Sequence, residues 1–424
     1  FDARTGAMRW VWDPIPRTGS DPAQLDWQPD QLQKTGAANA WAPLAADIDR
    51  RMVFVPTGSA SPDFYGGERR GSNRYANSLV ALAAETGRVI WAQQLVHHDV
   101  WDYDVPAQPT LVELEREGKM IPAVLQATKM GFIFSFHRET GEPLFAIEER
   151  PVPRQGEAGE DLSPTQPFPV APPPLTRQSP VTEEDAFGFA LVDKWLCARE
   201  IARYRSEGIY TPPSVQGSLM LPGWAGGMNW GGLAVDPATG IAVANVNDLA
   251  GLVALIPRDQ FVQQANSGDY PLAEFAAQAG TPYGMRRQPL LSIFGAPCVK
   301  PPWGTLAAVD MRNGTIKWQV PLGTTKDLAP WPLDNMALGV PNIGGPIITA
   351  GGLIFIAAAT DNFLRAFDLE TGEELWKGRL PAGGQATPMT YSLSTNGRQY
   401  IVIASGGHPG LGTAPGDYLV AFSL

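Results

Sequence analysis

A short motif recurs along this chain and constrains the fold more than any other feature. In each copy an apolar segment leads, through Asp or a substitute, into Thr-Gly or Asn-Gly, and a second segment follows that often includes Trp. Glycine at the end of the turn supplies the positive φ that a tight hairpin needs, and the upstream Asp can bond to the backbone of the turn. Each copy predicts a β-hairpin, and the copies lie at 1–10, 82–91, 136–141, 235–240, 309–318 and 367–376.

Repeated hairpins of this kind predict an all-β fold, a β-propeller of four-stranded blades. A single hairpin cannot bury its faces alone, whereas radial stacking of four-stranded sheets buries all of them. The chain begins inside a copy and holds six copies. We therefore expect a propeller that has seven or eight blades when intact and lacks its N-terminal blades here. Residues 1–424 are expected to form one domain.

The widest interval between copies predicts an insertion at about 146–225. It begins with a Pro-rich segment, 151–180, for which we expect no regular structure. After it, Thr182 resembles a helix N-cap with acids in the first turn, which predicts a helix that runs to about Arg205. Cys197 lies in this stretch; with Cys298 it forms no CxxC motif, and the two are either one disulfide or two buried thiols.

Charge and hydropathy exclude several classes of partner. A net charge of -11 argues against nucleic acid and anionic lipid, because both need basic patches. No run of about eighteen apolar residues occurs, so the sequence predicts no membrane span. There is no signal peptide either. Because the chain starts inside a repeat, we expect its natural N-terminus to be missing, together with any targeting segment.

The stretch 97–106 concentrates residues that could carry chemistry. It holds two of the four histidines, three aspartates and two aromatic residues. One interpretation is a turn whose Asp side chains cap backbone N–H groups while Trp101 and Tyr103 pack into the core. The other is a partly dry site in which a carboxylate beside an aromatic wall acts as a general base.

Further candidates lie in loops beside predicted strands. Trp41 precedes the strand 52–56, where it either packs within a blade or forms a platform for a ligand. The loop 57–63, which includes Ser61, is rich in small oxygen donors that suit a hard cation, although it could be only a turn. Lys129 leads into an apolar strand, so its ammonium group either reaches solvent or pairs with an anion.

Two later loops complete the set of candidates. The glycines of 226–232 permit close backbone approach to a ligand beside Asn229 and Trp230, or they simply form turns. His408 follows the predicted strand 400–404, where a lone histidine is usually solvated. The chain has no phosphate-binding loop, dinucleotide fingerprint or nucleophile elbow.

Taken together, these segments resemble the quinoprotein dehydrogenases, eight-bladed propellers that bind pyrroloquinoline quinone (PQQ) on the axis. The resemblance is strongest to the membrane-bound glucose dehydrogenase and its quinate/shikimate relatives, and it covers nearly the whole chain. The motifs that carry it lie at 41–43, 97–102, 106–109, 163–168, 210–214, 229–232 and 380–391.

The resemblance implies a role for each candidate. Asp102 would take the proton of the substrate hydroxyl, and Lys129 would approach the quinone oxygens. Three further residues would bind the cofactor: Trp41 by stacking on its face, and Asn229 and Trp230 by contact with its edge. His408 would select the sugar. Ser61 would be a ligand of a divalent cation, Ca²⁺ or Mg²⁺, whose other ligands are expected upstream of Phe1.

The implied function is oxidation of an aldose such as D-glucose to its lactone, with electrons passed to ubiquinone. The resemblance also implies a periplasmic enzyme, attached to the inner membrane only through the missing N-terminal segment. Within the same class, quinate, shikimate or another polyol is the alternative substrate. An alternative of another class is a non-catalytic propeller scaffold of the outer-membrane assembly type, which has the repeat but no need for the site residues to converge.

Overall fold

The repeated turns join neighbouring antiparallel strands in the computed structural model, which describes residues 1–17, 21–394 and 397–423. The second copy connects β3 (Ser78–Ala83) to β4 (Val89–Gln94), with Gly87 at a φ of 70°. The copies at 309–318 and 367–376 behave alike. Among the described residues, no strand flanks the copy at 1–10, and the copy at 136–141 pairs only through an isolated bridge between Phe136 and Pro143. The copy at 235–240 differs in its place within the sheet. That copy joins β11 (Ala234–Asp236) to β12 (Ile241–Asn247), which are the first two strands of their sheet. Counting copies is therefore not the same as counting blades.

Sheets of three or four strands follow one another along the described residues, as expected for an all-β propeller chain. Three have four strands in sequential order, β1-β2-β3-β4, β11-β12-β16-β17 and β18-β19-β20-β21, and two have three, β5-β6-β7 and β22-β23-β24. The strands not yet given are β1 (Ala45–Asp47), β2 (Met52–Pro56), β5 (Thr110–Arg116), β6 (Lys119–Ala127), β7 (Ile133–His137), β16 (Gly304–Asp310), β17 (Thr315–Pro321), β18 (Ile347–Ile348), β19 (Leu353–Ile356), β20 (Phe363–Asp368), β21 (Glu374–Arg379), β22 (Met389–Ser392), β23 (Gln399–Ser405) and β24 (Tyr418–Ser423).

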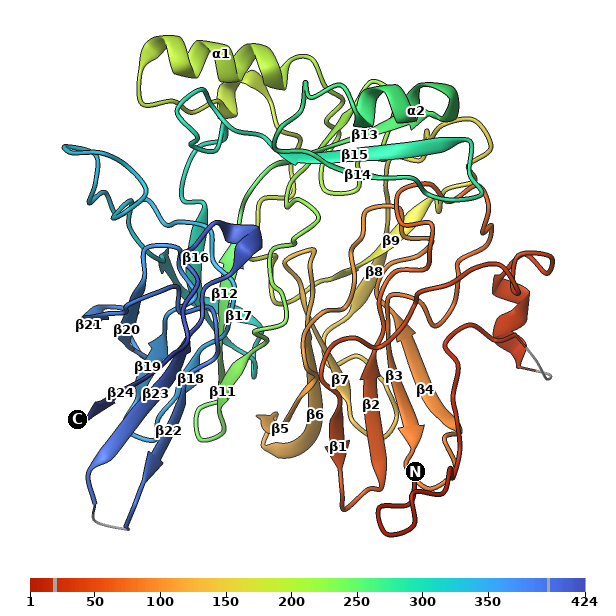
Figure 1. The fold of residues 1–424 in the computed structure, drawn as a ribbon. Helices are drawn as coiled ribbons and strands as arrows, with labels where there is room; N and C mark the ends of the chain where they lie inside the picture. The colour runs from red at the N-terminus through yellow and green to blue at the C-terminus, as the bar shows by residue number, and fades with distance from the viewer. Residues whose placement is uncertain (18–20, 395–396, 424) are drawn as a thin grey trace.

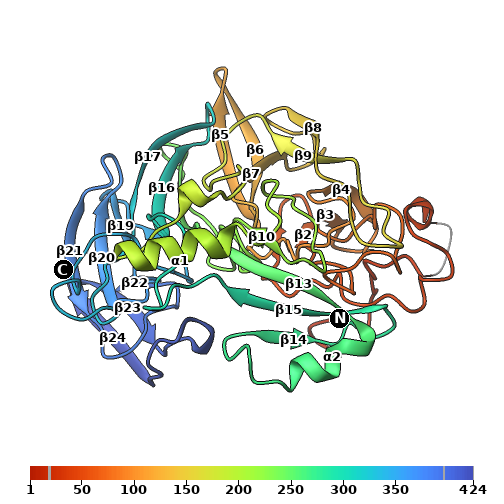
Figure 2. The same ribbon diagram turned by 90° about the horizontal axis from the view of Figure 1, so that it is seen from above.

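These sheets stand side by side as blades around an arc, in chain order (Figures 1 and 2). The first strand of each sheet faces the inside of the arc. Accordingly β5 contacts both β1 and β11, and β18 contacts β11. The short 3₁₀ helices η1 (Pro22–Asp26) and η3 (Pro409–Leu411) lie in loops near the two ends of the chain.

A tryptophan of one repeat packs on the glycine of the next, and this contact joins neighbouring blades. A Cβ on the glycine would lie within 2.7 Å of the indole ring, so no larger residue fits there without movement. Each indole N–H donates to a backbone carbonyl of the same turn, at 2.9 to 3.0 Å. The pairs are Trp10 on Gly87, Trp91 on Gly141 and Trp318 on Gly372.

The first excursion from the blades lies between β7 and β11, and two predictions made for it are wrong. The Pro-rich segment is not wholly irregular, because β9 (Thr165–Pro169) pairs with β8 (Ile147–Pro151). The helix does not begin at Thr182, since the capping box there closes only a 3₁₀ turn, η2 (Glu183–Asp185), before Ala186 becomes extended. The α-helix proper is α1 (Leu191–Ile201).

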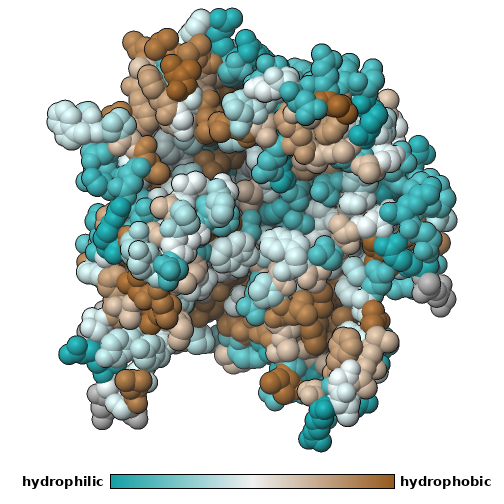
Figure 3. Space-filling model, in the orientation of Figure 1, coloured by the Kyte–Doolittle hydropathy of each residue, from teal (hydrophilic) through white to brown (hydrophobic). Residues whose placement is uncertain are grey.

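A disulfide between Cys197 and Cys298 ties α1 to a loop 101 residues further along the chain, which decides between the two alternatives for these cysteines. The helix exposes apolar side chains: Leu191 and Trp195 are exposed, while Asp193 is buried. Figure 3 shows apolar side chains gathered at the upper left, where α1 lies. Neither of the described α-helices is long and apolar enough to cross a membrane.

A second excursion, between β12 and β16, was not predicted from the sequence. It consists of β13 (Gly251–Pro257), α2 (Arg258–Ala265), β14 (Glu274–Ala276) and β15 (Tyr283–Pro289). With β10 (Ser218–Met220) these strands form a separate sheet of order β10-β13-β15-β14. The sheet lies across one end of the arc, on the same side as α1 (Figures 1 and 2).

Candidate active site

The candidate residues all lie in loops at one end of the blades. In an antiparallel sheet of sequential strands, the loop that enters the first strand and the loop between the second and third strands share one end. Trp41 and Asn229 precede first strands, and Asp102 lies between β4 and β5. Lys129 and His408 lie between second and third strands. The repeat turns between third and fourth strands occupy the opposite end.

Lys129 and Asp102 meet at the centre of this cluster of loops. The Lys129 Nζ lies 3.3 Å from Asp102 Oδ1 and 2.8 Å from Asp104 Oδ2. It also donates to the Asp102 carbonyl oxygen at 2.6 Å. Lys129 is only 5% exposed, so of its two predicted alternatives the structure has the anion-paired one. The ammonium group is held by oxygens from a single turn, where Asp102 adopts a φ of 60°.

The electrostatics of the pair make Asp102 the stronger base of the two carboxylates. Burial raises the pKa of Asp102 well above its usual range, although the Lys129 charge opposes this. Burial also acts to raise the pKa of Asp104, but Lys129 and the Ser59 N–H outweigh it and hold that pKa below its usual range. Burial acts to lower the pKa of Lys129, because it disfavours the charged form. The carboxylates of Asp102 and Asp104 outweigh this effect and raise that pKa.

Asp99 performs the capping role that the alternative interpretation gave to the acids of this stretch. Its carboxylate accepts hydrogen bonds from the backbone N–H groups of Trp101 and Tyr103, both at 3.1 Å, and from the Ser59 hydroxyl. Burial raises its pKa to about 6. The capping interpretation is therefore confirmed for Asp99, which builds the turn, whereas Asp102 faces Lys129.

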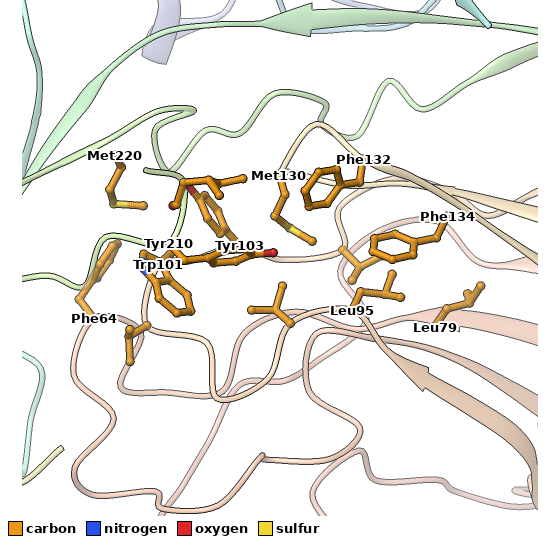
Figure 4. Close-up of a cluster of buried hydrophobic side chains, with 14 of the residues drawn as sticks. Phe64, Leu79, Leu95, Trp101, Tyr103, Met130, Phe132, Phe134, Tyr210 and Met220 are labelled. Atoms are coloured by element: carbon orange, nitrogen blue, oxygen red, sulfur yellow. The ribbon is translucent and has the colours of Figure 1, made fainter. Parts of the chain in front are cut away.

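Trp101 and Tyr103 anchor the turn in a buried aromatic cluster, which Figure 4 shows in close-up. The Trp101 indole N–H donates to the Thr211 carbonyl at 2.8 Å, and the Tyr103 hydroxyl donates to the Pro222 carbonyl at 2.7 Å. Tyr210 packs edge-on against both rings. Because these anchors come from the part of the first excursion that follows α1, that segment fixes the position of Asp102.

Trp41 lies in the same cluster of loops as Asp102 and Lys129, where its side chain faces solvent. Its side chain is 45% exposed, which is unusual for a tryptophan that packs within a blade. A Cβ placed on Gly58 would lie 3.3 Å from the Trp41 Nε1 and 2.5 Å from Asp104 Oδ1. The indole edge and the acidic turn therefore both adjoin Gly58, where the lack of a side chain leaves room for them.

The glycine-rich loop 226–232 packs directly on Lys129. The Gly227 N–H donates to the Lys129 carbonyl at 2.6 Å, and a Cβ on Gly226 would lie 2.4 Å from the Lys129 Cγ. The Asn229 side chain forms its hydrogen bonds within its own loop. Its Nδ2 donates to the Ala225 carbonyl at 2.6 Å, and its Oδ1 accepts from the Trp230 N–H at 2.8 Å. The close approach that glycine permits is thus an approach to Lys129.

His408 and Ser61 are not joined to Lys129 or Asp102 by any hydrogen bond or ion pair in the described part of the chain. The His408 N–H donates to the Thr413 hydroxyl at 2.7 Å, and its Nδ1 is buried without a partner. The Ser61 N–H donates to the Gly36 carbonyl at 3.1 Å. Within residues 1–17, 21–394 and 397–423, no three His, Cys, Asp or Glu side chains are grouped so as to hold a metal ion.

The sequence analysis missed Arg287, which reaches the site from β15. Its Nη1 lies 3.1 Å from Asp102 Oδ2, so Asp102 is paired with a cation on each oxygen. No motif marks this position. Only charge balance could have predicted a second cation here. Several buried carboxylates in one turn need more positive charge than the single Lys129 supplies.

The chain is similar to known proteins over its whole length. Residues 1–401 match the family model of the glucose/ethanol/alcohol dehydrogenase β-propeller domain, labelled PQQ. The chain is 41% identical to the quinoprotein glucose dehydrogenase of Escherichia coli (strain K12) over 432 residues, covering 100% of this chain and 53% of that protein. It is 39% identical to the quinate/shikimate dehydrogenase (quinone) of Acinetobacter baylyi, with 100% and 53% covered.

Among solved structures, the quinohemoprotein alcohol dehydrogenase of Comamonas testosteroni superposes with a TM-score of 0.64 at 22% identity, covering 100% of this chain and 55% of that one. At this identity the likeness shows the fold alone. The chain spans about half the length of the curated relatives it matches. The family match and the full-length identities confirm the resemblance found in the sequence: the chain belongs to the PQQ-dependent quinoprotein dehydrogenases, in their β-propeller domain.

Proposed function

We propose that the protein oxidises an aldose such as D-glucose to its lactone, with PQQ as cofactor and Asp102 as the base. The observation that carries the proposal is the buried contact of 3.3 Å between Asp102 and Lys129. It lies in a chain that is 41% identical, over its whole length, to a quinoprotein glucose dehydrogenase. A scaffold would have no use for a buried base held between two cations.

The residues at the site fit an anionic, planar quinone. Lys129 supplies a buried ammonium group, and the half-exposed Trp41 supplies an aromatic surface beside it. Gly58 and Gly226 line the same place, where a Cβ would collide with the surrounding side chains. The described residues do not by themselves supply a divalent-cation site, so Ser61 remains a proposed ligand that would need others.

When bound, PQQ supplies the acceptor for the two electrons that leave the substrate. The chain's own part is proton transfer and charge compensation. Asp102 removes the hydroxyl proton, and its burial makes it a stronger base than an exposed carboxylate. Lys129 compensates the charge that develops beside it, in a site where water screens little. Trp41, Asn229 and Trp230 are proposed to hold the cofactor.

Quinate or shikimate is the second candidate substrate, because identity to the quinate/shikimate dehydrogenase is 39%, close to that of the glucose enzyme. His408 is the proposed substrate-selecting residue. Transfer of electrons to ubiquinone, a periplasmic location and anchoring in the inner membrane through a further segment complete the proposal. Each of these concerns the whole protein, and this chain spans about half the length of the relatives it matches.

The test is reconstitution of the full-length protein with PQQ and Ca²⁺ or Mg²⁺, followed by dye reduction with sugars, quinate, shikimate and simple alcohols. We expect turnover with an aldose or a cyclic polyol. Asp102→Asn should abolish turnover while PQQ still binds, as measured by fluorescence titration. Asp269→Asn, at an exposed loop acid, is the matched control and should leave turnover unchanged. Near-normal turnover of Asp102→Asn would exclude Asp102 as the base.

A further inference from the structure

Arg287 is held in place from several sides at once. Its guanidinium group lies 3.1 Å from Asp102 Oδ2 and 2.7 Å from Glu274 Oε2. It also lies 5.4 Å from the Trp224 ring and 5.9 Å from the Phe64 ring. An arginine side chain loses much rotamer freedom when it is fixed in this way, so the contacts must outweigh that cost. The arrangement leaves the guanidinium group aimed at the proposed base.

We propose that Arg287 is the positioning residue of Asp102: it fixes the carboxylate through Oδ2 and keeps it ionised, while Lys129 contacts Oδ1. This inference rests on the proposed function. Arginine suits the task because its planar group stays charged at every working pH and therefore does not exchange a proton with its partner. A lysine at the same place would offer a single point charge and could lose its proton on burial.

The charge balance around Asp102 shows why one cation is not enough. The charged groups that face it are Lys129 from the β6–β7 turn, Asp104 from its own loop, Asp63 from the β2–β3 loop and Arg287 from β15. Asp63 also has the charge of Arg69 close by, whereas Asp102 and Asp104 depend on Lys129 and Arg287. Without Arg287 these two carboxylates would share Lys129 alone, and one of them would take up a proton. Asp102, which is already the harder to ionise, is the expected site of that proton.

The proposal also gives the second excursion a function. The strand β15 belongs to none of the blades; it is the third strand of the sheet that lies across one end of the arc (Figure 2). Its neighbouring residue Arg286 points to the other face, where its guanidinium group stacks on Tyr270 at 3.6 Å. The excursion therefore brings Arg287 to the catalytic end, while the adjacent Arg286 lies on the opposite face of the sheet, buried against Tyr270.

The test uses full-length holoenzyme carrying Arg287→Gln, with kcat, KM and their pH profiles measured by dye reduction. We expect kcat to fall at least 10-fold with KM changed by less than threefold. The acid limb of the kcat profile should move to higher pH, because loss of the cation raises the pKa of Asp102. Arg287→Lys should recover part of kcat. Added methylguanidinium should raise the kcat of Arg287→Ala.

Arg286→Gln is the matched control on the same strand, and it should change neither kcat nor the pH profile. If Arg287→Gln keeps the parent kcat and pH profile while Asp102→Asn is inactive, the inference is overturned and the proposed function stands. If Asp102→Asn itself keeps turnover, the proposed function fails first. If Arg287→Gln does not fold, Arg287→Ala with and without methylguanidinium decides, and a kcat and acid limb that the added cation leaves unchanged overturn the proposal.

Discussion

At the scale of single residues, the position of Lys129 depends on a glycine that touches it. Gly226 has a φ of 79°, and a Cβ there would lie 2.4 Å from the Lys129 Cγ and 2.6 Å from its Cα. The second of these atoms is backbone, so the added methyl group cannot be accommodated by a side-chain rotation alone. The absence of a side chain at Gly226 thus determines where the ammonium group of Lys129 lies.

Gly226→Ala should therefore lower kcat by at least 10-fold, because it moves Lys129 away from Asp102. The matched control is Gly268→Ala, where φ is 78° and no atom lies within 4 Å of the added Cβ. Both variants carry the same backbone strain, of about 1–2 kcal/mol, so both should lower the melting temperature. Only Gly226→Ala should lose activity in the dye assay. Equal activity of the two would show that the contact with Lys129 is unimportant.

The residues of the site could be predicted from the sequence only where a motif carried them. Asp102, Lys129 and Trp41 belong to recognisable segments, and the structure brings all three to one place. Arg287 could not be found in this way, because a strand residue that contacts a carboxylate 185 positions earlier leaves no local signal. The partners of Asn229 were equally hidden, since an amide can bond to its own loop or to a ligand with the same sequence around it.

At the scale of the elements, the repeat is explained by the contact between blades. The Thr-Gly turn needs glycine for its positive φ, and the same glycine leaves space for the tryptophan of the preceding blade. The motif therefore predicted a tight turn at each copy, but not every copy is a strand hairpin: in the part of the chain that the structure describes, no strand flanks the one at 1–10. Nor could the motif tell which hairpin of a blade it marked. The copy at 235–240 has the same turn chemistry within the inner pair of strands.

The excursions were harder to predict than the blades. The strand β13 has the apolar character of a blade strand, whereas β15 holds two arginines and a glutamine. Nothing in either sequence shows that the two strands pair with each other outside the ring of blades. The false start of the helix at Thr182 has a similar cause. A capping box specifies how a turn begins, whereas the continuation depends on the residues that follow, and here the chain leaves the helical region at Ala186.

Trp91→Ala tests the contact between blades. Trp91 is 8% exposed, packs on Gly141 and donates to the Arg138 carbonyl at 3.0 Å. Its loss should lower the free energy of unfolding by about 3–5 kcal/mol, as for other buried aromatics. Trp376→Ala is the control, because Trp376 is 40% exposed and should cost less than half as much. Urea unfolding measures both, and equal losses would contradict the assigned contact.

At the scale of the whole molecule, acids gather at the end of the arc that carries the site, in a chain whose net charge is -11. Burial raises the pKa of several of them, and for Asp99 it does so to about 6. The others in this set are Asp63, Asp102, Glu160 and Asp248. The folded state therefore holds their protons more tightly than the unfolded chain does, which links folding to pH.

A group whose pKa is raised on folding contributes stability below its unfolded pKa, and that stability is lost as the pH rises through the folded pKa. For Asp99 the loss occurs between its unfolded value and about 6. His98 acts in the opposite direction, because burial lowers its pKa to about 3, so its contribution is present above pH 6.5 and is lost as the pH falls toward 3. Below about pH 6 the contributions of Asp99 and His98 to stability therefore oppose each other.

In His98→Asn, which keeps a donor for the Gly71 carbonyl but does not titrate, we expect the melting temperature of the metal-chelated apoprotein to rise by about 2 °C or more as the pH falls from 6 to 4. In the parent protein the protonation of His98 opposes this rise over the same pH range. Calorimetry in 0.5 M NaCl separates the causes, because salt screens repulsion between surface charges and has little effect on buried acids. If the rise disappears in salt, surface repulsion explains it, and the buried acids at the site do not control the stability of the fold.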